Sequence, residues 1–486
     1  MHGADDSLTL LTDLYQLTMA YGYWKTGTLD REAVFHLFFR KNPFKGGYAL
    51  AAGLAQAVAW LDQLRFTDDD RAYLATLTGN DGAPLFSPEF LDYLGAMRLR
   101  CDIDAVPEGT AVFAHEPLLR VRGPLVQCQL LETALLNILN FQTLIATKAA
   151  RVCDAARGDA VLEFGLRRAQ GVDGALSASR AAYLGGCAST SNVLAGKRFG
   201  IPVKGTHAHS WVMSFDDELE AFNAYADAMP NNCVFLVDTY DTVEGVRRAV
   251  AVAQRIRSQG HRFIGVRLDS GDLAELSVAA RKILDDGGFP DAVIVASNDL
   301  DENLIQSLKH QGATISVWGV GTKLVTGSDQ PALGGVYKLA AIREGDGPWR
   351  HKVKLSEQAI KVSTPGIHQV RRFTRDGVFL GDMIYNTADE APPSHTAIDP
   401  MDLTRRVTYA DDAAWEDLLV PIYRDGQRVY ELPTLDASRA RAHAQVASLP
   451  SAVRRFEFPQ LYPVGLEQRL HALRTELILQ HREAKP

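Results

Sequence analysis

The sequence predicts an α/β protein in which a barrel-like (β/α) domain is combined with a mixed α/β domain built from the N- and C-terminal segments. From residue 160 onward, short apolar runs alternate with polar or glycine-rich tips and helical segments. Several successive runs lie about 30 residues apart, which is the length of one βα unit. The runs are also continuously apolar, as expected for parallel strands that are buried on both faces.

The N-terminal part begins with an expected helix over residues 8–24, where apolar side chains recur at helical spacing and Thr12 and Asp13 can cap the helix. A strand-like stretch, AVFHLFFRK, and a Pro/Gly turn follow it. Residues 48–100 favour helices, and residues 102–123 favour short strands separated by turns. We therefore expect an N-terminal mixed α/β domain over residues 1–130.

The central segment, residues 131–345, is expected to be the barrel-like α/β catalytic domain. Its apolar runs end at Glu163, His209, Asp238, Asp269, Asp299 and Gly319. In an open doubly wound sheet the ligand binds where the strand order reverses, whereas in a barrel all C-terminal strand ends meet at one mouth. Because nearly every run ends in a chemically useful group, we expect a complete or incomplete barrel of the TIM type. Residues 346–486, strand-rich at first and helical over 465–483, are expected to return to the N-terminal domain.

Composition argues against several classes of function. The 59 acidic residues outnumber the 51 basic ones and give a net charge of −8 without long like-charge blocks, so no nucleic-acid partner is expected. No apolar run reaches the ~18 residues of a membrane span, and the N-terminus is acidic where a signal peptide is basic. The five cysteines lack CxxC spacing, which indicates reduced thiols. These features predict a cytoplasmic protein without a membrane partner.

Two imidazoles stand two positions apart in KGTHAHSWVMSF. Either His207 or His209 can be a reagent, or both can be ordinary polar residues of a turn. If the strand ends share one cavity, they lie close to the motif GVRLDSGD, whose carboxylates can bind hydroxyl groups or a cation and whose arginine can bind an anion. The alternative for that motif is a helix start capped by Asp269 or Ser270.

Two further motifs suit a flat anionic ligand. In EFGLRR, Phe164 stands close to Arg167, although a core phenylalanine near surface arginines is equally common. In VWGVGTKLVTG, the glycines at 319 and 321 can expose backbone N–H groups to a phosphate or form an ordinary tight turn. Their spacing matches neither the dinucleotide fingerprint nor the P-loop. Periodicity alone makes Tyr15 a core residue of the first helix.

With these residues assembled, the sequence resembles the nicotinate phosphoribosyltransferase family. The matching stretches run in order over residues 7–375: LLTDLYQLTMAYGYW, FFRKNPFKGGYALAAGL, EFGLRRAQG, STSNVLAG, GTHAHSWVMSF, VDTYDT, GVRLDSGDL and VGTKLVT. The resemblance implies a type II phosphoribosyltransferase that works as a head-to-tail homodimer with shared active sites. The implied reaction, part of NAD biosynthesis and salvage, joins nicotinate to phosphoribosyl pyrophosphate with coupled ATP hydrolysis, and it requires Mg²⁺.

The resemblance also implies roles for individual residues. His209 would form a phosphohistidine and Asp238 would orient its ring, while His207 departs from the family pattern and competes for the role. Tyr15, reaching across from the other subunit, and Phe164 would enclose the pyridine ring.

Further residues would contact the two substrates. Thr206 and Arg267 would bind nicotinate. Phosphoribosyl pyrophosphate would be held by Arg167, Asp269, Gly319 and Gly321, and Ser363 is also assigned to the substrate site. Phosphate contacts across the subunit interface would come from Arg40, Lys338, Lys354 and Lys361. The resemblance leaves the Mg²⁺ ligands unassigned.

Alternative functions remain open at this point. A nicotinamide phosphoribosyltransferase would carry an aspartate near Ser191 and Asn192, and the absence of that aspartate favours nicotinate. A quinolinate phosphoribosyltransferase would be much shorter and would carry a denser basic pocket. A barrel metal-dependent hydrolase would use HAH and the aspartates as metal ligands. A non-catalytic scaffold is the last alternative, because a fold does not by itself specify a function.

Overall fold

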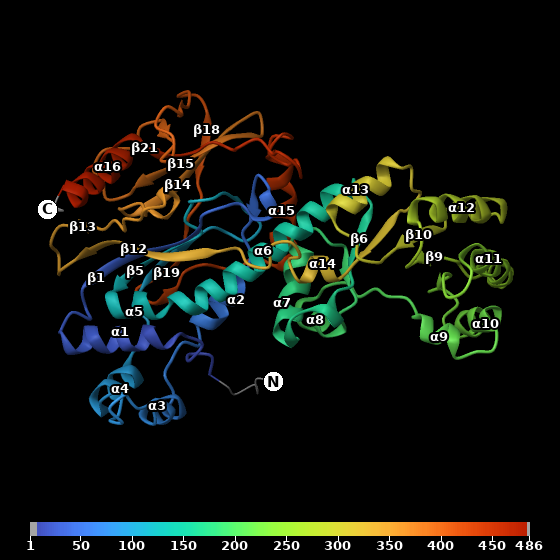
Figure 1. Ribbon diagram of the computed structural model, residues 1–486, viewed down its shortest axis with the longest axis horizontal. Coiled ribbons are helices and arrows are strands. Elements are labelled where there is room, and N and C mark those ends of the chain that lie inside the picture. Colours follow the sequence, from blue (N-terminus) through green and yellow to red (C-terminus); the bar gives the residue numbers. More distant parts are fainter. Residues whose placement is uncertain (1–6, 484–486) are drawn as a thin grey trace. The chain divides into compact units, whose positions relative to one another are not determined.

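The computed structural model describes residues 7–483, which fall into two compact units (Figure 1). One unit is formed by Met1–Leu144 together with Ala332–Pro486, and the other is Ile145–Pro331. These boundaries differ from the domain limits of 130 and 345 that the sequence predicts. The helix α6 (Glu132–Ala156) begins after residue 130 and continues without a break across the boundary after Leu144. Strand β12 (Gly335–Arg343) pairs with β1 (Glu32–Phe39), so these residues belong to the first unit.

The first unit contains a seven-stranded sheet in the order β13-β12-β1-β5-β3-β19-β20. Buried and half-buried side chains alternate along β5, whereas the central strand β1 is buried along most of its length. Apolar side chains of β1, such as Phe35 and Leu37, join a core cluster under this sheet. The other strands of the sheet are β13 (Arg350–His351), β5 (Leu119–Pro124), β3 (Asp102–Ala105), β19 (Val420–Arg424) and β20 (Gln427–Arg428).

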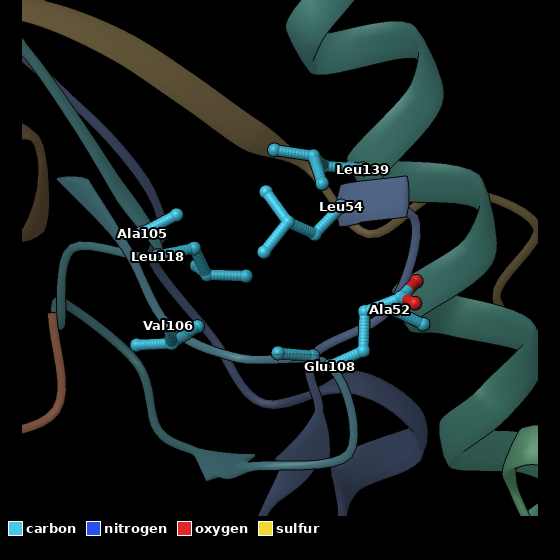
Figure 2. A pocket seen from close by; sticks show the side chains of 8 residues that line it. Ala52, Leu54, Ala105, Val106, Glu108, Leu118 and Leu139 are labelled. Carbon is cyan, nitrogen blue, oxygen red and sulfur yellow. The ribbon is translucent and has the colours of Figure 1, made fainter. Parts of the chain in front are cut away.

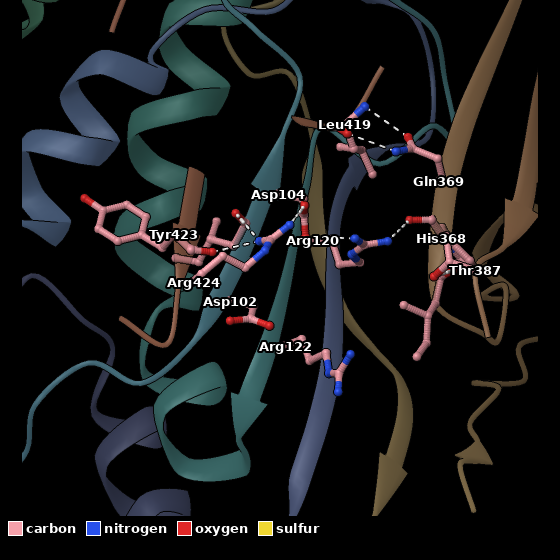
Figure 3. Close-up of polar contacts among 12 residues, drawn as sticks. Asp102, Asp104, Arg120, Arg122, His368, Gln369, Thr387, Leu419, Tyr423 and Arg424 are labelled. Atoms are coloured by element: carbon pink, nitrogen blue, oxygen red, sulfur yellow. Dashed lines mark hydrogen bonds and ion pairs between the residues drawn. The ribbon is translucent and has the colours of Figure 1, made fainter. Parts of the chain in front are cut away.

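A second sheet of the same unit has the order β17-β16-β21-β15-β14-β18. Figure 3 shows how polar side chains tie the two sheets together. Arg120 of β5 donates to Asp104 Oδ2 at 2.8 Å and to the His368 carbonyl oxygen of β14 at 2.7 Å. The strands are β14 (His368–Arg375), β15 (Val378–Asn386), β16 (Thr396–Ile398), β17 (Arg406–Thr408), β18 (Ala414–Asp417) and β21 (Val464–Glu467). The start of the segment 346–486 was expected to be strand-rich, but between β13 and His368 it contains no regular strand.

The helices α5 (Leu125–Leu130) and α16 (Gln468–Glu483) contact these sheets, and the short strands β2 (Ala49–Leu50) and β4 (Ala111–Val112) pair with each other. The helix α2 begins after Gly53, whose φ of 100° lies in the left-handed region and whose N–H donates to Glu108 Oε1 at 2.7 Å. Figure 2 shows Glu108 beside the small, mostly apolar cavity that this turn borders. The helices are α1 (Leu14–Lys25), α2 (Leu54–Leu61), α3 (Asp68–Ala75), α4 (Pro88–Ala96), α5 (Leu125–Leu130), α15 (Leu435–Ser448) and α16 (Gln468–Glu483), with 3-10 turns at Pro43–Lys45 and Ala359–Lys361.

The second unit is built on a six-stranded parallel sheet in the order β7-β6-β11-β10-β9-β8. Strands β8 to β11 are neighbours in chain order, and β11 then pairs with β6, as in the circular order of a barrel. Among the described residues no pairing joins β7 to β8, so the α/β class is confirmed and a closed barrel is not. The strands are β6 (Ala160–Glu163), β7 (Ser189–Thr190), β8 (Val234–Leu236), β9 (Gly265–Leu268), β10 (Val293–Ala296) and β11 (Val317–Val320).

The gap in the sheet lies where a strand was expected over residues 201–210. That segment forms only an isolated parallel bridge from Val203 to Thr190, because Pro202 has no N–H to continue a ladder. A strand that the sequence analysis missed, β7, takes the edge position instead.

Each strand of the second unit leads into a helix (Figure 1). The aspartates in the connecting loops have two different roles. Asp241, Asp272 and Asp301 are N-caps whose carboxylates accept backbone N–H groups at 2.8–3.0 Å. Asp238 and Asp269 lie closer to the strand ends and contact each other instead of capping a helix. The helices are α7 (Gly171–Leu184), α8 (Val193–Phe199), α9 (His209–Met213), α10 (Glu218–Ala228), α11 (Thr242–Ser258), α12 (Leu273–Asp286), α13 (Glu302–His310) and α14 (Thr322–Val325), with a 3-10 turn at Leu166–Arg168.

The thiol prediction is confirmed, since all five cysteines are free. Cys101 and Cys128 approach with their sulfur atoms 3.9 Å apart without a disulfide. Over residues 7–483, none of the helices combines the length and the apolar character that a membrane crossing would need.

Candidate active site

Three adjacent parallel strands of the second unit gather side chains that are far apart in the sequence. Strands β8, β9 and β10 pair in register, and Asp238, Asp269 and Ser297 follow their C-terminal ends. Asp238 Oδ2 accepts the backbone N–H of Asp269 at 2.7 Å, and the Ser297 hydroxyl donates to Asp269 Oδ1. The strand ends are therefore joined directly by their polar groups.

His209 faces this edge, but it is the first residue of the short helix α9 and not the end of a strand as expected. Its side chain is 39% exposed. Nδ1 lies 3.1 Å from Thr239 Oγ1, while Nε2 lies 4.0 Å from Asp238 Oδ1 and 3.8 Å from Asp269 Oδ2. The two carboxylate distances exceed hydrogen-bond length, yet they put both negative charges on the same side of the ring. One nitrogen therefore faces carboxylates and the other faces a hydroxyl group.

Asp238 is almost completely buried, with a side chain that is 1% exposed. Its Oδ2 accepts two hydrogen bonds, from the Asp269 N–H and from the Ser270 hydroxyl, both at 2.7 Å. Its Oδ1, the atom nearest His209, is buried and has no hydrogen-bond partner among the described residues. A buried carboxylate oxygen without a donor calls for an explanation, and an imidazole N–H is the donor within reach.

Arg267 of β9 is held by three neighbours at the same edge. Its Nε donates to Ser297 Oγ at 2.9 Å, Nη1 donates to Thr206 Oγ1 at 3.0 Å, and Nη2 donates to Asp269 Oδ1 at 2.8 Å. Three of the five guanidinium N–H groups are used in this way, which leaves two for an anionic ligand. Burial alone would raise the pKa of Asp269, but the hydrogen bond from Ser297 and the charge of Arg267 outweigh it, and the pKa is lowered.

Phe164 lies beside this arginine, with the Arg267 Cζ atom 5.7 Å from its ring centre. The ring rests on the end of β11, where a Cβ at Gly319 would come within 2.7 Å of the Phe164 ring. A Cβ at Gly321 would meet the backbone of the residues that follow β6 at 3.2 Å. The two glycines therefore let the Phe164 loop lie directly on the end of β11.

Arg167 and Asp299 are exposed, whereas Glu163 at the end of β6 is buried. Arg167 lies in the 3-10 turn Leu166–Arg168, and Asp299 follows β10. Asn298 and Asp299 have φ values of 96° and 41°, a left-handed backbone that non-glycine residues adopt at a cost. A turn of this kind at a strand end often belongs to a functional loop.

His207 is distinguished from His209 by its surroundings. It is 8% exposed, and its Nε2 accepts the backbone N–H of Leu236 on β8 at 3.2 Å. Burial lowers the pKa of His207 to about 4, so the ring is neutral near pH 7. This hydrogen bond links the segment after Val203 to β8 at the gap in the sheet, so His207 has a structural role.

The cationic residues expected to act across a subunit interface lie in the first unit. Burial lowers the pKa of Lys338, and the charges of Arg40 and Lys354 act in the same direction, so these three cations are neighbours. The Ser363 hydroxyl accepts the Lys354 N–H at 2.8 Å. Lys361 is exposed in the 3-10 turn Ala359–Lys361. The structure thus gathers Arg40, Lys338 and Lys354, with Ser363 beside them.

Tyr15 is 48% exposed, so its expected place in the core of the first helix is wrong. Gln16, Leu17 and Ala20 of α1 are buried instead. Apolar side chains are spread around this helix, and periodicity therefore could not select the buried face.

Sequence reasoning missed two polar residues of the site. Thr239 contacts His209, and Ser297 holds both Arg267 and Asp269. Each follows an apolar run within three residues, so the rule that found Asp238 applied to them as well. Their hydroxyl groups carry no charge, and for that reason they were not singled out.

A metal-dependent hydrolase would need a cluster of metal-ligating side chains, and the structure describes residues 7–483. No group of three or more His, Cys, Asp or Glu side chains in that part of the chain is arranged to hold a metal ion. The histidine pair and the aspartates therefore do not form the ligand set that the hydrolase alternative needs.

Models of three domains cover nearly the whole chain. The nicotinate phosphoribosyltransferase N-terminal domain matches residues 10–140, the family domain matches residues 160–345, and the C-terminal domain matches residues 367–474.

Whole-length relatives agree with these matches. The chain is 44% identical to nicotinate phosphoribosyltransferase of Bacillus subtilis, with 97% of both chains covered, and 38% identical to that of Homo sapiens, with 96% of both covered. The crystal structure of human nicotinic acid phosphoribosyltransferase superposes with a TM-score of 0.84 at 35% identity and covers 96% of this chain and 100% of that one. Given these relatives and the site described above, the chain belongs to the nicotinate phosphoribosyltransferase family of enzymes.

Proposed function

We propose that this enzyme couples ATP hydrolysis to the synthesis of nicotinate mononucleotide. Nicotinate, phosphoribosyl pyrophosphate, ATP and water give nicotinate mononucleotide, pyrophosphate, ADP and phosphate. The observation that supports this best is the convergence of a cation, two carboxylates and an exposed imidazole on one strand edge. The substrates are proposed from family membership, and the role of each side chain is proposed from its position at this edge.

The nicotinate carboxylate would bind Arg267. This guanidinium keeps two N–H groups after its three internal bonds, and one carboxylate takes a pair of parallel hydrogen bonds. The Phe164 ring beside it would stack on the pyridine. Asn192 occupies part of the site where an amide-selective relative would carry an aspartate, and it is used as the N-cap of α8, accepting the Ala195 N–H at 3.2 Å. No acidic group at that position would repel the carboxylate.

His209 would accept the γ-phosphoryl group of ATP, so that a P–N bond forms as the P–O bond to ADP breaks. Nε2 faces Asp238 and Asp269, and a phosphoryl group on that nitrogen would meet two negative charges. We therefore assign the phosphoryl group to Nδ1, with the proton kept on Nε2 towards Asp238 Oδ1. The Thr239 hydroxyl, 3.1 Å from Nδ1, is placed to donate to a phosphoryl oxygen. The contacts of Nε2 would shorten once substrates bind.

In the second step the nicotinate nitrogen attacks C1 of the ribose and the bond to pyrophosphate breaks. The chain's task is to hold the two reactants in line and to balance the charge that develops. Asp269 would accept hydrogen bonds from the ribose hydroxyls through Oδ2, since Oδ1 is taken by Arg267 and Ser297. Water then cleaves the P–N bond of His209, which makes the overall reaction downhill.

The Mg²⁺ that the family implies fits the donor set of this edge. Mg²⁺ usually binds one or two carboxylates together with substrate phosphates, rather than a cage made by the protein alone. Asp269, whose pKa is lowered and whose Oδ2 is not used by Arg267 or Ser297, is the carboxylate that would hold it beside the ribose hydroxyls. When bound, the ion would neutralise charge on the pyrophosphate leaving group.

The strand order supports a barrel-like arrangement of the second unit. β7 and β8 would flank an opening bridged by the His207–Leu236 hydrogen bond rather than by a paired strand. All strand ends would then border one cavity.

We further propose a homodimer with shared active sites. The exposure of Tyr15 and the cluster of Arg40, Lys338 and Lys354 support it, because both leave groups of the first unit available to another chain. Mixing Tyr15→Ala chains with His209→Ala chains should restore part of the activity in hybrid dimers. If hybrids form and stay inactive, the sites are not shared.

The decisive assay compares nicotinate with nicotinamide, each with and without ATP, and measures mononucleotide formation. We expect nicotinate to be strongly preferred and ATP to raise its turnover. Incubation with γ-labelled ATP should give an acid-labile label that His209→Ala lacks and His207→Ala retains. Equal kcat/KM for the amide would overturn the substrate assignment, and a labelled His209→Ala protein would overturn the phosphohistidine.

A further inference from the structure

The first unit holds a cavity of about 490 Å³, and none of its lining residues is assigned to the reaction above. The cavity lies against β15, β16, β17, β21 and α16 of the second sheet, with the turn after β4 on another side. Cavities of this size accommodate small organic ligands. The question is which chemistry its walls would select.

The most informative wall residue is Arg474 of α16. It is 8% exposed, and within residues 7–483 no side chain or carbonyl forms a hydrogen bond or ion pair with it. Burial lowers the pKa of Arg474, and no neighbouring carboxylate offsets that effect. A buried guanidinium without a partner is costly, and it is retained where an anion compensates it.

The cavity wall carries more arginine than carboxylate side chains and therefore more positive than negative charge. Arg406 is exposed on β17, and no ion pair joins it to the described residues. Arg405 is paired, with its Nε 3.1 Å from Asp402 Oδ2. The wall carboxylate Asp399 accepts the Met401 N–H at 2.8 Å.

His115 stands at the same wall in a left-handed backbone conformation, with φ of 73°. Burial lowers its pKa to about 4, with a further contribution from the charge of Arg474, so it is neutral near pH 7. A neutral imidazole can donate a hydrogen bond to an anion without adding charge. Its position next to Arg474 extends the polar part of the wall.

The remaining wall is largely apolar and aromatic. Tyr409 stacks on Phe373 with ring centres 3.9 Å apart, and its hydroxyl group is buried without a partner among the described residues. Tyr462 stacks on Phe113 at 3.8 Å and donates to Asp382 Oδ1 at 2.8 Å. Such a wall suits a flat ring with a few polar edges.

We propose that this cavity binds a phosphate monoester with a flat ring, of the nucleoside monophosphate class. The phosphate lies between Arg474 and Arg406, and the ring lies towards Tyr409. A phosphate monoester carries about two negative charges near pH 7, which matches the two arginines that lack a carboxylate partner.

The first test locates the site. The full-length protein is irradiated with 8-azido-adenosine monophosphate, and the modified peptides are identified by mass spectrometry. We expect modification within residues 397–409 or 461–466, suppressed by excess adenosine monophosphate and unchanged in Arg267→Ala. Modification confined to peptides around His209 would overturn the proposal.

The second test uses stability and affinity together. Arg474→Met keeps the length of the side chain and removes the charge, so it should raise the Tm of the unliganded protein while weakening adenosine monophosphate binding at least tenfold in calorimetry. Arg406→Gln, at an exposed position, should weaken binding severalfold without changing Tm. The matched control is Arg375→Gln, an exposed arginine of β14 that pairs with Asp412 and does not line the cavity. It should leave the affinity unchanged.

Three results contradict the inference. If Arg474→Met lowers Tm, the arginine has a structural role. If all three variants bind adenosine monophosphate like the wild type, the ligand sits elsewhere. If inorganic phosphate binds as tightly as adenosine monophosphate, the apolar wall does not recognise a ring and the site is for a simple anion.

Discussion

Replacing Asp238 by asparagine separates the orienting role of its charge from its shape. The change is isosteric, and an amide oxygen can still accept the two hydrogen bonds that Oδ2 accepts from the Asp269 N–H and the Ser270 hydroxyl at 2.7 Å. The amide nitrogen then takes the place of Oδ1 and faces Nε2 of His209, 4.0 Å away. An N–H donor at that point favours the tautomer with the lone pair on Nε2, and Nδ1 loses the lone pair with which it would attack ATP.

The size of the effect follows from the same distance. Two unit charges 4 Å apart interact by about 4 kcal/mol at an effective dielectric constant of 20 and by about 1 kcal/mol in bulk water. The first value corresponds to a loss of about 1000-fold and the second to a loss of about 5-fold, at 1.36 kcal/mol for each factor of ten. Because the His209 side chain is 39% exposed, water screens the pair and the loss should be about 10- to 100-fold.

The assay is the rate of acid-labile label incorporation from γ-labelled ATP in a single turnover. Ser270→Ala is the matched control, because it removes one donor to Oδ2 and leaves the carboxylate charge in place; its rate should stay within about 3-fold of wild type. Thermal melting shows whether either variant is simply less folded. The reasoning is refuted if Asp238→Asn is labelled at the wild-type rate, or if Ser270→Ala slows labelling as much as Asp238→Asn does.

Further predictions concern the neighbours of the site. Ser297→Ala removes a partner of the Arg267 guanidinium and should raise KM for nicotinate about tenfold with a smaller effect on kcat, whereas a fall in kcat alone would contradict a positioning role. His207→Ala leaves the N–H of Leu236 without its acceptor and should cost about 1–3 kcal/mol of stability, seen as a lower Tm, while the phosphoenzyme still forms. Tm should also fall between pH 6.5 and pH 4, because histidines with a folded pKa below 6.5 bind more protons once unfolded; a flat profile would contradict the burial of His36, His115, His207 and His368.

Much of the site was accessible from the sequence because parallel strands obey simple rules. A buried strand reads as a continuous apolar run, and the residue that follows it must lie at the C-terminal edge of the sheet. That rule placed Asp238 and Asp269 at one edge although 31 residues separate them, and the structure joins them by a hydrogen bond. The resemblance of the motifs to one family then indicated the reaction in which these side chains take part.

Other features depended on contacts that no local pattern records. Local pattern alone could not tell His207 from His209, since both follow the same apolar segment, and only the family resemblance favoured His209. In the structure, the Leu236 N–H and the burial around it make His207 structural, and the start of α9 leaves His209 exposed. Similarly, periodicity placed Tyr15 in the core, because it does not reveal which face of an all-round apolar helix packs on α5. The buried charge of Arg474 was also invisible in the sequence, because a guanidinium lacks a partner only after α16 has packed on the second sheet. Strand order and chemistry at strand ends follow from short segments of the chain, whereas burial and hydrogen-bond partners arise only when distant segments meet.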